Sequence, residues 1–187
     1  MDAANVDLKA FTERFYNKIC GGNLMTVLDT LQYLKHETDV WLEITNLIIP
    51  GENDSTGELE EMTRWVVENL GDDVPMHFTG FHPDWKMRNK VPTPAETLLN
   101  ARRIAQGNGV RYAYTGNIND NIGGTTFCSE CDRKLITRNW YSLSDWNLDE
   151  LGRCSYCKHP CKGHFEPQPG SWGTQRRPVR LSDFSTH

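Results

Sequence analysis

Two Cys-x2-Cys pairs carry the clearest chemical signal in the sequence. Cys128 and Cys131 form the first pair, and Cys154 and Cys157 form the second pair after 22 intervening residues. Each pair can present two thiolates from one tight turn, and two such turns complete the tetrahedral site that zinc prefers. We therefore expect a structural four-cysteine zinc site as in a zinc ribbon or rubredoxin. Short strands are expected between the pairs, at 135–138, at Trp140–Tyr141 and at Leu148.

A further cysteine leaves a second reading of this region open. Cys154, Cys157 and Cys161 have Cys-x2-Cys-x3-Cys spacing, which is also able to hold an iron–sulfur cluster. That reading leaves the first cysteine pair without a partner, so zinc is favoured. His159 and His164 are possible substitute ligands, although their position favours surface residues.

A second group of chemically capable residues lies in the stretch Met76–Lys86. It begins as a strand and stops at Pro83, and it contains two histidines, a carboxylate and a lysine. Ligands bind at the carboxyl ends of parallel strands in α/β proteins. A strand that merely ends in polar residues is the alternative, with His77 packed or outward-facing. The loop after Pro83 is where we expect recognition of a substrate or partner.

Polar residues also interrupt two other predicted strands. Asn5, Asp7 and Lys9 share one strand face by the two-residue period, either toward solvent or in the interior at a strand end. Glu43 and Thr45 interrupt one face of a continuously apolar strand. A buried carboxylate needs a partner or a ligand, so Glu43 is a candidate site residue.

The elements that must position these residues alternate along the chain. We expect strands at 2–9, 41–49, 76–82 and 110–115, and helices at 12–20, 24–36, 56–70 and 95–106. Such alternation predicts parallel strands with right-handed crossovers. Four strands are too few to close a (β/α) barrel, which usually needs about 250 residues. The pattern therefore indicates the second half of a larger barrel, or one half of a two-chain assembly.

The organisation changes after residue 122, where helical periodicity gives way to cysteines, tryptophans and turn residues. We predict two domains, an α/β domain over 1–122 and a cysteine-rich module with its tail over 123–187. The net charge of −5 gives no indication of nucleic-acid binding. We find no membrane-spanning apolar run and no signal peptide, so we expect a cytoplasmic protein with reduced cysteines.

Several of these motifs, in this order, resemble those of the radical S-adenosylmethionine (SAM) enzymes related to pyruvate formate-lyase activating enzyme. The motifs are Asp7-Leu8-Lys9-Ala10-Phe11, Ile48-Ile49-Pro50-Gly51-Glu52-Asn53-Asp54, the His77–Lys86 stretch, Tyr114-Thr115-Gly116-Asn117 and the cysteine module. The sequence is most similar to the radical SAM proteins of the AmmeMemoRadiSam system, which are encoded beside Memo-like and AMMECR-like proteins.

The resemblance implies a fold, a cofactor and a set of contacts. The fold would be the carboxyl-terminal half of a radical SAM barrel, followed by a zinc-ribbon-like module. Such enzymes use SAM and a 4Fe–4S cluster to generate a 5′-deoxyadenosyl radical that abstracts hydrogen from a substrate. Activating enzymes often place an arginine on the strand before the Pro-Gly turn, where this sequence has Glu43 and Thr45. The implied cofactor-binding residues are Asp7, Lys9, Glu43, Thr45, His82 and Asn117.

One family feature does not occur in residues 1–127. The family binds its cluster through a Cys-x3-Cys-x2-Cys motif, and Cys20 is the only cysteine in this part of the chain. We therefore expect the cluster ligands outside this chain, on an amino-terminal barrel half encoded by the same gene or by a separate chain. The chain alone is then an incomplete and inactive part of an enzyme.

A non-catalytic zinc-ribbon scaffold is the alternative function. A zinc site whose four ligand positions are all protein residues is structural rather than catalytic. Trp140, Trp146, Trp172 and the pair Arg176–Arg177 would then offer a surface for docking a partner.

Overall fold

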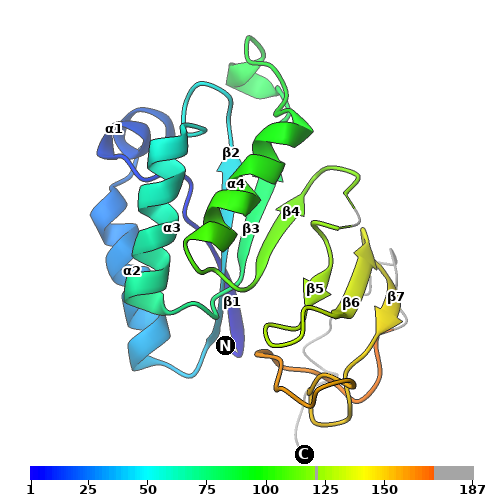
Figure 1. Ribbon diagram of the computed structural model, residues 1–187. Coiled ribbons are helices and arrows are strands. Elements are labelled where there is room, and N and C mark those ends of the chain that lie inside the picture. Colours follow the sequence, from blue (N-terminus) through cyan, green and yellow to red (C-terminus); the bar gives the residue numbers. More distant parts are fainter. Residues whose placement is uncertain (121, 171–187) are drawn as a thin grey trace, which may run out of the picture.

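The computed structural model describes residues 1–120 and 122–170, and it has an α/β part followed by a small antiparallel sheet (Figure 1). The α/β part contains β1 (Ala3–Asp7), α1 (Glu13–Phe15), the π-helical turn η1 (Tyr16–Cys20), α2 (Leu24–Glu37), β2 (Trp41–Ile48), α3 (Thr56–Leu70), β3 (Met76–Gly80), the 3-10 turn η2 (Trp85–Met87), α4 (Ala95–Gly107) and β4 (Ala113–Gly116). The small sheet contains β5 (Thr126–Phe127), β6 (Lys134–Asn139) and β7 (Ser142–Trp146).

The larger sheet is parallel, with strand order β1-β2-β3-β4. Its register aligns Asp7, Thr45, His77 and Tyr114 in one row across the four strands. Since successive side chains of a strand point to opposite faces, these four side chains share one face of the sheet.

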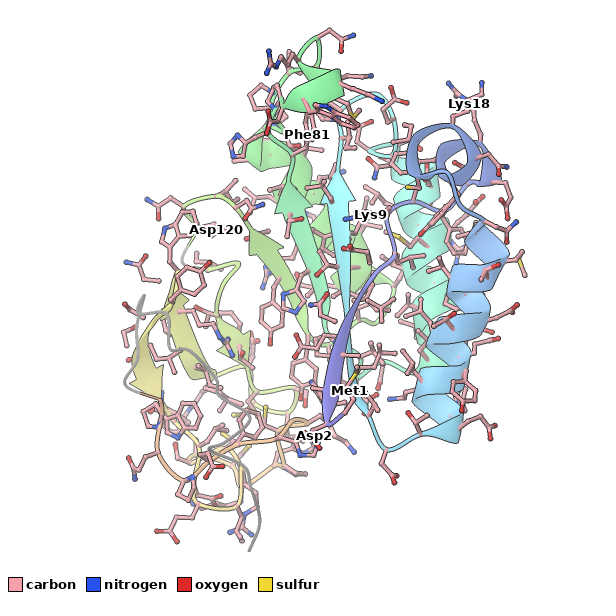
Figure 2. The ribbon with its side chains drawn as sticks, turned by 180° about the vertical axis from the view of Figure 1, so that it is seen from behind. Met1, Asp2, Lys9, Lys18, Phe81 and Asp120 are labelled. Atoms are coloured by element: carbon pink, nitrogen blue, oxygen red, sulfur yellow. The ribbon has the colours of Figure 1, made fainter. Side chains whose placement is uncertain are left out.

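The two faces of the parallel sheet differ in their covering. The long helices α2, α3 and α4 lie on one face (Figure 1), and Figure 2 shows the opposite face without a helix over it. The helix side holds the core, in which Ile44, Met76 and Phe78 are fully buried. The helix-free side carries the polar row described above. This arrangement leaves one sheet face available for a binding site.

Local signals in the sequence explain where the helices begin. The side chain of Asn23 caps α2 by accepting a hydrogen bond from the Thr26 amide, and Ser55 caps α3 by accepting one from the Glu58 amide. The predicted capping box at α3 is only half formed, because the Glu58 carboxylate accepts from the Phe11 amide instead. That bond joins the segment after β1 to the start of α3.

The second sheet forms a separate small core around the cysteines. Leu135, Ile136 and Leu148 are buried beside Cys128 and Cys154. The antiparallel pairs β5–β6 and β6–β7 build this ribbon-like module, which lies beside β4 (Figure 1). The predicted fold class is confirmed: a four-stranded parallel α/β sheet is followed by a small module whose four cysteines could form a zinc-ribbon-like site.

Three details of the predicted elements are wrong. Trp140 and Tyr141 form the turn between β6 and β7 rather than a strand. The fourth parallel strand begins at Ala113, three residues later than predicted. The first predicted helix is a three-residue α-helix followed by a π-helical turn that ends at Gly21, where the backbone is left-handed. No helix within the described residues is long and apolar enough to cross a membrane.

Candidate functional site

The four cysteines of the two Cys-x2-Cys pairs converge on one point. Their sulfur atoms all lie within 4.8 Å of one another. Cys128 Sγ is 3.6 Å from Cys157 Sγ, and Cys131 Sγ is 3.7 Å from Cys154 Sγ. A tetrahedral ion with zinc–sulfur bonds of about 2.3 Å requires sulfur–sulfur distances of roughly 3.8 Å. The four thiols therefore fit a single tetrahedral metal ion.

Backbone groups of the second cysteine turn favour a thiolate at this centre. Burial opposes ionisation of Cys154, but the backbone N–H groups of Cys157 and Tyr156 lower its pKa to about 7. A metal ligand must be a thiolate, so these N–H groups prepare the sulfur for metal binding.

Cys161 lies outside the four-cysteine group. Its Sγ is 3.9 Å from the Tyr112 hydroxyl, and burial raises the pKa of the Cys161 thiol. Among the described residues, the cysteines that converge on a possible metal position are only those of the two pairs. The geometry thus favours the four-cysteine reading over the Cys-x2-Cys-x3-Cys cluster reading.

Three of the predicted cofactor residues belong to β1 and β2. Asp7 ends β1, Lys9 follows it by two residues, and Thr45 lies within β2. Lys9 Nζ is 3.0 Å from Asp7 Oδ1, and both side chains are partly exposed. Thr45 is the register partner of Asp7, and its hydroxyl donates to Asn5 Oδ1 at 2.8 Å. The helix-free face therefore presents a carboxylate, an ammonium group and a hydroxyl group together.

His82 and Asn117 follow the carboxyl ends of the neighbouring strands β3 and β4. His82 is exposed two residues beyond β3. Asn117 has a left-handed backbone (φ 61°), and its Nδ2 donates to the Gly80 carbonyl at 3.2 Å. These two residues thus lie beyond the ends of their strands, whereas Thr45, the register partner of Asp7 and His77, lies three residues before the end of β2. Their cofactor roles remain predictions.

Two buried asparagines fix the chain where it leaves β1. Asn46 Nδ2 donates to the carbonyls of Leu8 and Lys9, and Asn53 Nδ2 also donates to the Lys9 carbonyl. Both asparagine side chains are almost fully buried. They hold the Lys9 backbone and so position its side chain. Sequence reasoning missed this role, although an asparagine inside an apolar strand is a signal for it.

Glu43 lies two residues before Thr45 and belongs to a different cluster. Its Oε2 is 2.7 Å from His77 Nε2, and its Oε1 accepts from the Trp41 indole N–H at 3.0 Å. The hydrogen bond from His77 lowers the pKa of the Glu43 carboxyl, burial opposes the shift, and the Trp41 bond adds to it. Glu43 therefore has the partner that a carboxylate in an apolar strand requires.

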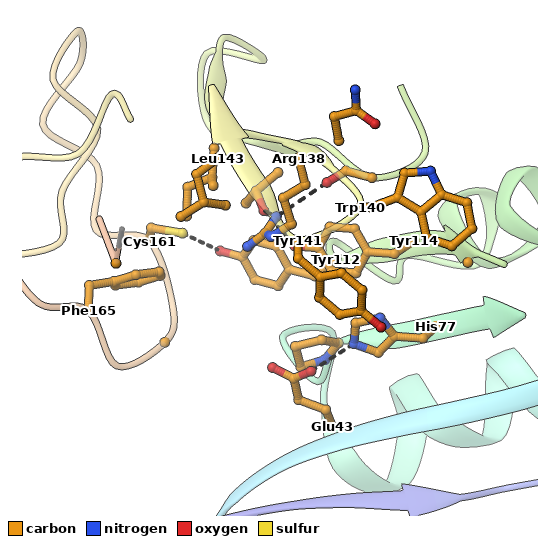
Figure 3. A pocket seen from close by; sticks show the side chains of 18 of the residues that line it. Glu43, His77, Tyr112, Tyr114, Arg138, Trp140, Tyr141, Leu143, Cys161 and Phe165 are labelled. Atoms are coloured by element: carbon orange, nitrogen blue, oxygen red, sulfur yellow. Dashed lines mark hydrogen bonds and ion pairs between the residues drawn. The ribbon is translucent and has the colours of Figure 1, made fainter. Parts of the chain in front are cut away.

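A cavity of about 930 Å³ lies between the helix-free sheet face and the cysteine module. Figure 3 shows Glu43, His77 and Tyr114 from the sheet on one side, and Arg138 and Trp140 from the module on the other. The His77 ring stacks on the Tyr114 ring, with 5.1 Å between their centroids.

Tyr114 and Arg138 also connect the sheet to the module. The Tyr114 hydroxyl is 2.9 Å from Thr126 Oγ1, which accepts a hydrogen bond from Arg138 Nη1 at 2.7 Å. Burial raises the pKa of Tyr114, and hydrogen bonding to Thr126 opposes that shift. The tyrosine therefore stays a neutral phenol that joins the two parts of the chain.

A second tyrosine contact closes the other side of the cavity. The Tyr112 hydroxyl accepts from the Lys162 amide at 3.2 Å, and burial raises the Tyr112 pKa to about 12. The ring of His164 lies edge-on to the Trp41 ring, with centroids 5.7 Å apart. The segment after Cys161 thus reaches the amino-terminal part of the sheet.

His77, Tyr114 and Arg138 were not identified as site residues from sequence. His77 and Tyr114 lie in motifs that carry the resemblance, but their contacts join residues that are far apart in the chain. The alternation within β3 was an available signal, because it places His77 on the face opposite Phe78.

The scaffold alternative predicted a docking surface of tryptophans and arginines. Trp140 and Trp146 lie in the cysteine module, whereas Trp172 and Arg176–Arg177 are outside the described residues.

Comparison with known proteins supports the fold. A domain of pyruvate-formate lyase-activating enzyme from Bacteroides vulgatus superposes with a TM-score of 0.52. The match covers 60% of this chain and 66% of that domain, at 16% sequence identity. The likeness shows a shared fold. At this identity it says nothing about activity.

Sequence comparison finds a relative that is longer than this chain. An uncharacterized protein from Methanocaldococcus jannaschii is 40% identical over 158 residues, which cover 84% of this chain and 47% of that protein. The chain therefore spans about half the length of this relative. No protein-family model matches the chain.

The chemistry of the side chains shows which cofactors the described residues could bind. The four cysteines fit one metal ion, and they occupy all four of its positions. A 4Fe–4S cluster for SAM needs three cysteines and an open iron, and no second group of three metal-binding side chains occurs among the described residues. The sheet edge, by contrast, has charged and hydrogen-bonding groups of the kind that a zwitterionic nucleoside such as SAM requires.

Proposed function

We propose that this chain is the carboxyl-terminal part of a radical SAM enzyme and that its sheet edge holds SAM. The observation that carries the proposal is the polar group of Asp7, Lys9 and Thr45 on the helix-free face of a parallel sheet, in a fold like that of an activating-enzyme domain. His82 and Asn117 follow the carboxyl ends of β3 and β4 in the same sheet. The carboxyl edge of parallel strands is the usual ligand position in such folds.

The roles of the individual groups follow from their chemistry. The Asp7 carboxylate can accept hydrogen bonds from ribose hydroxyls, and the Lys9 ammonium can bind the carboxylate of the methionine part. His82 and Asn117 provide further polar contacts from β3 and β4. Together with a reduced cluster, SAM supplies a 5′-deoxyadenosyl radical for hydrogen abstraction.

We place the cluster on strands that would pair beside β1. The Leu8 amide donates to Thr45 and the Asp2 carbonyl accepts from Trp41, so even-numbered residues of β1 face β2. The backbone groups of Ala3, Asn5 and Asp7 therefore point away from β2. An exposed row of this kind is a template for another strand. The partner would be an amino-terminal barrel half, from the same gene or a separate chain.

The test is production of 5′-deoxyadenosine. The chain alone, after anaerobic reconstitution with iron and sulfide and with SAM and dithionite present, should give none. Addition of a barrel half with the Cys-x3-Cys-x2-Cys motif should restore the product, and Lys9→Met should remove it again. Product formation by the chain alone would show that the cluster site lies within these 187 residues. Memo-like and AMMECR-like proteins are proposed partners, to be tested by co-purification.

A structural scaffold is the second candidate function. Four protein ligands leave no open position on a metal ion at the cysteine centre. The exposed side chains of Trp140 and Tyr141, at the turn between β6 and β7, are a possible docking surface. This candidate predicts that SAM does not bind and that the chain captures a protein partner through the cysteine module.

A further inference from the structure

A guanidinium group without a carboxylate partner lies on the module side of the cavity. Arg138 Nη1 donates to the carbonyl of Gly124 at 3.3 Å and to Thr126 Oγ1 at 2.7 Å. An arginine has five N–H donors, and no described residue accepts a hydrogen bond from its Nε or Nη2 groups. No carboxylate oxygen among residues 1–120 and 122–170 lies within 4.0 Å of this guanidinium. Glu43 interacts with it electrostatically at longer range, so the cation keeps N–H donors for an anionic ligand.

An oriented histidine lies on the sheet side. The Glu43 carboxylate is only an acceptor, so His77 Nε2 carries the hydrogen of their 2.7 Å bond. In the neutral imidazole, Nδ1 is then an acceptor, and the described residues supply no donor to it. The Trp41 bond holds Glu43, and the Tyr114 ring supports the imidazole. In that form, His77 presents an oriented acceptor at the cavity wall.

Two exposed aromatic side chains border the same cavity. Trp140 and Tyr141 form the turn after β6 and are 61% and 71% exposed. Both line the same cavity as His77 and Tyr114 (Figure 3). The Trp140 backbone is left-handed (φ 53°), where glycine or asparagine is usual, and such departures concentrate at functional sites. The turn therefore adds aromatic surface at the cavity mouth.

We propose that this cavity binds a small aromatic carboxylate. Arg138 would bind the carboxylate, the aromatic side chains would pack on the ring, and His77 Nδ1 would accept from a ring hydroxyl. The volume of about 930 Å³ lies within the usual range of small-molecule sites, roughly 300–1,000 Å³. The inference does not depend on SAM chemistry, because Arg138, His77, Trp140 and Tyr141 have no role in the proposed SAM site, although Asn117 of that site also lines the cavity.

The test uses the metal-loaded full chain and three probes. Indole N–H signals of Trp41, Trp140 and Trp146, assigned with single Trp→Phe variants, report from the cavity lining. The probe 4-hydroxybenzoate should shift them saturably. The amide 4-hydroxybenzamide lacks the charge, and cyclohexanecarboxylate has a saturated ring without the hydroxyl group, so each should bind at least about tenfold more weakly. Equal binding of the amide, or no saturable shift with 4-hydroxybenzoate, would overturn the proposal.

Substitutions test whether 4-hydroxybenzoate binds in this cavity. Arg138→Gln should weaken 4-hydroxybenzoate about tenfold. Arg133→Gln is the matched control, because Arg133 lies over the Tyr156 ring of the same module and does not line the cavity. Equal effects of the two changes would contradict the assignment. If Arg138→Gln loses its metal or unfolds, His77→Phe serves instead: it should reduce the affinity for 4-hydroxybenzoate to that for benzoate, and retention of the difference would count against the site.

Discussion

His77 Nε2 lies 2.7 Å from Glu43 Oε2, so two neighbouring strands are joined by a charged hydrogen bond on the helix-free face of the sheet. The bond is diagonal, because the register partner of His77 on β2 is Thr45. It fixes the histidine against Tyr114 and therefore connects the sheet, through Tyr114 and Thr126, to the cysteine module.

The first prediction concerns the pH dependence of this bond. The folded pKa of Glu43 is below its ordinary value of 4.5, so its stabilising contribution is present above pH 4.5 and is lost as the pH falls through the folded pKa. Glu43→Gln should lower the unfolding free energy at pH 7 by about 1 kcal/mol, since the pair is partly exposed. Urea unfolding should show that the difference in unfolding free energy between the unchanged chain and Glu43→Gln becomes smaller at acidic pH. Glu68→Gln, on the exposed surface of α3, should show no such pH dependence, and a constant difference for Glu43→Gln would contradict the account.

The second prediction concerns the metal centre. Elemental analysis should find one zinc and no iron per chain, and Cys157→Ser should remove the zinc. Cys161→Ser should retain it, because Cys161 lies outside the four-cysteine group. Removal of the metal with a chelator should unfold the module, whose core includes Cys128 and Cys154. Two or more irons per chain, or zinc loss in Cys161→Ser, would contradict the four-cysteine site.

The third prediction concerns the connection between the two parts. A Cβ atom at Gly123 would lie 1.9 Å from Thr115 Oγ1 and 2.3 Å from Asp120 Oδ2, so Gly123→Ala must displace the end of β4. We expect a loss of roughly 1–3 kcal/mol in unfolding free energy. Gly57→Ala is the control, because nothing lies within 4 Å of that position on α3. It should be neutral or stabilising by about 0.4–1 kcal/mol. Equal thermal midpoints for the two variants would show that Gly123 is not closely packed.

The sequence predicted the features that depend on local pattern. Alternating strands and helices gave the parallel α/β fold, and the Cys-x2-Cys spacing gave the four-cysteine group, because both follow from residues close together in the chain. The turn at Trp140 was missed, since two aromatic residues are poor turn formers and their strand propensity suggested a strand.

The cavity depended on contacts that local pattern does not reveal. The pairing of Glu43 with His77 requires the strand register, and the approach of Arg138 to Tyr114 requires the packing of the module beside β4. Of the residues predicted from resemblance, Asp7 and Thr45 are register partners, Glu43 pairs with His77, and His82 and Asn117 follow the carboxyl ends of β3 and β4. Their cofactor roles remain predictions.

Binding of SAM, mapped by residue, tests the central claim most directly. In an amide NMR titration of the metal-loaded chain, we predict saturable shifts at Asp7, Lys9, Thr45, His82 and Asn117. Lys9→Met should remove these shifts, whereas Lys18→Met should leave them, because the exposed Lys18 side chain points away from Lys9 (Figure 2). Saturable shifts confined to the cysteine module, or none at all, would contradict a SAM site at this edge.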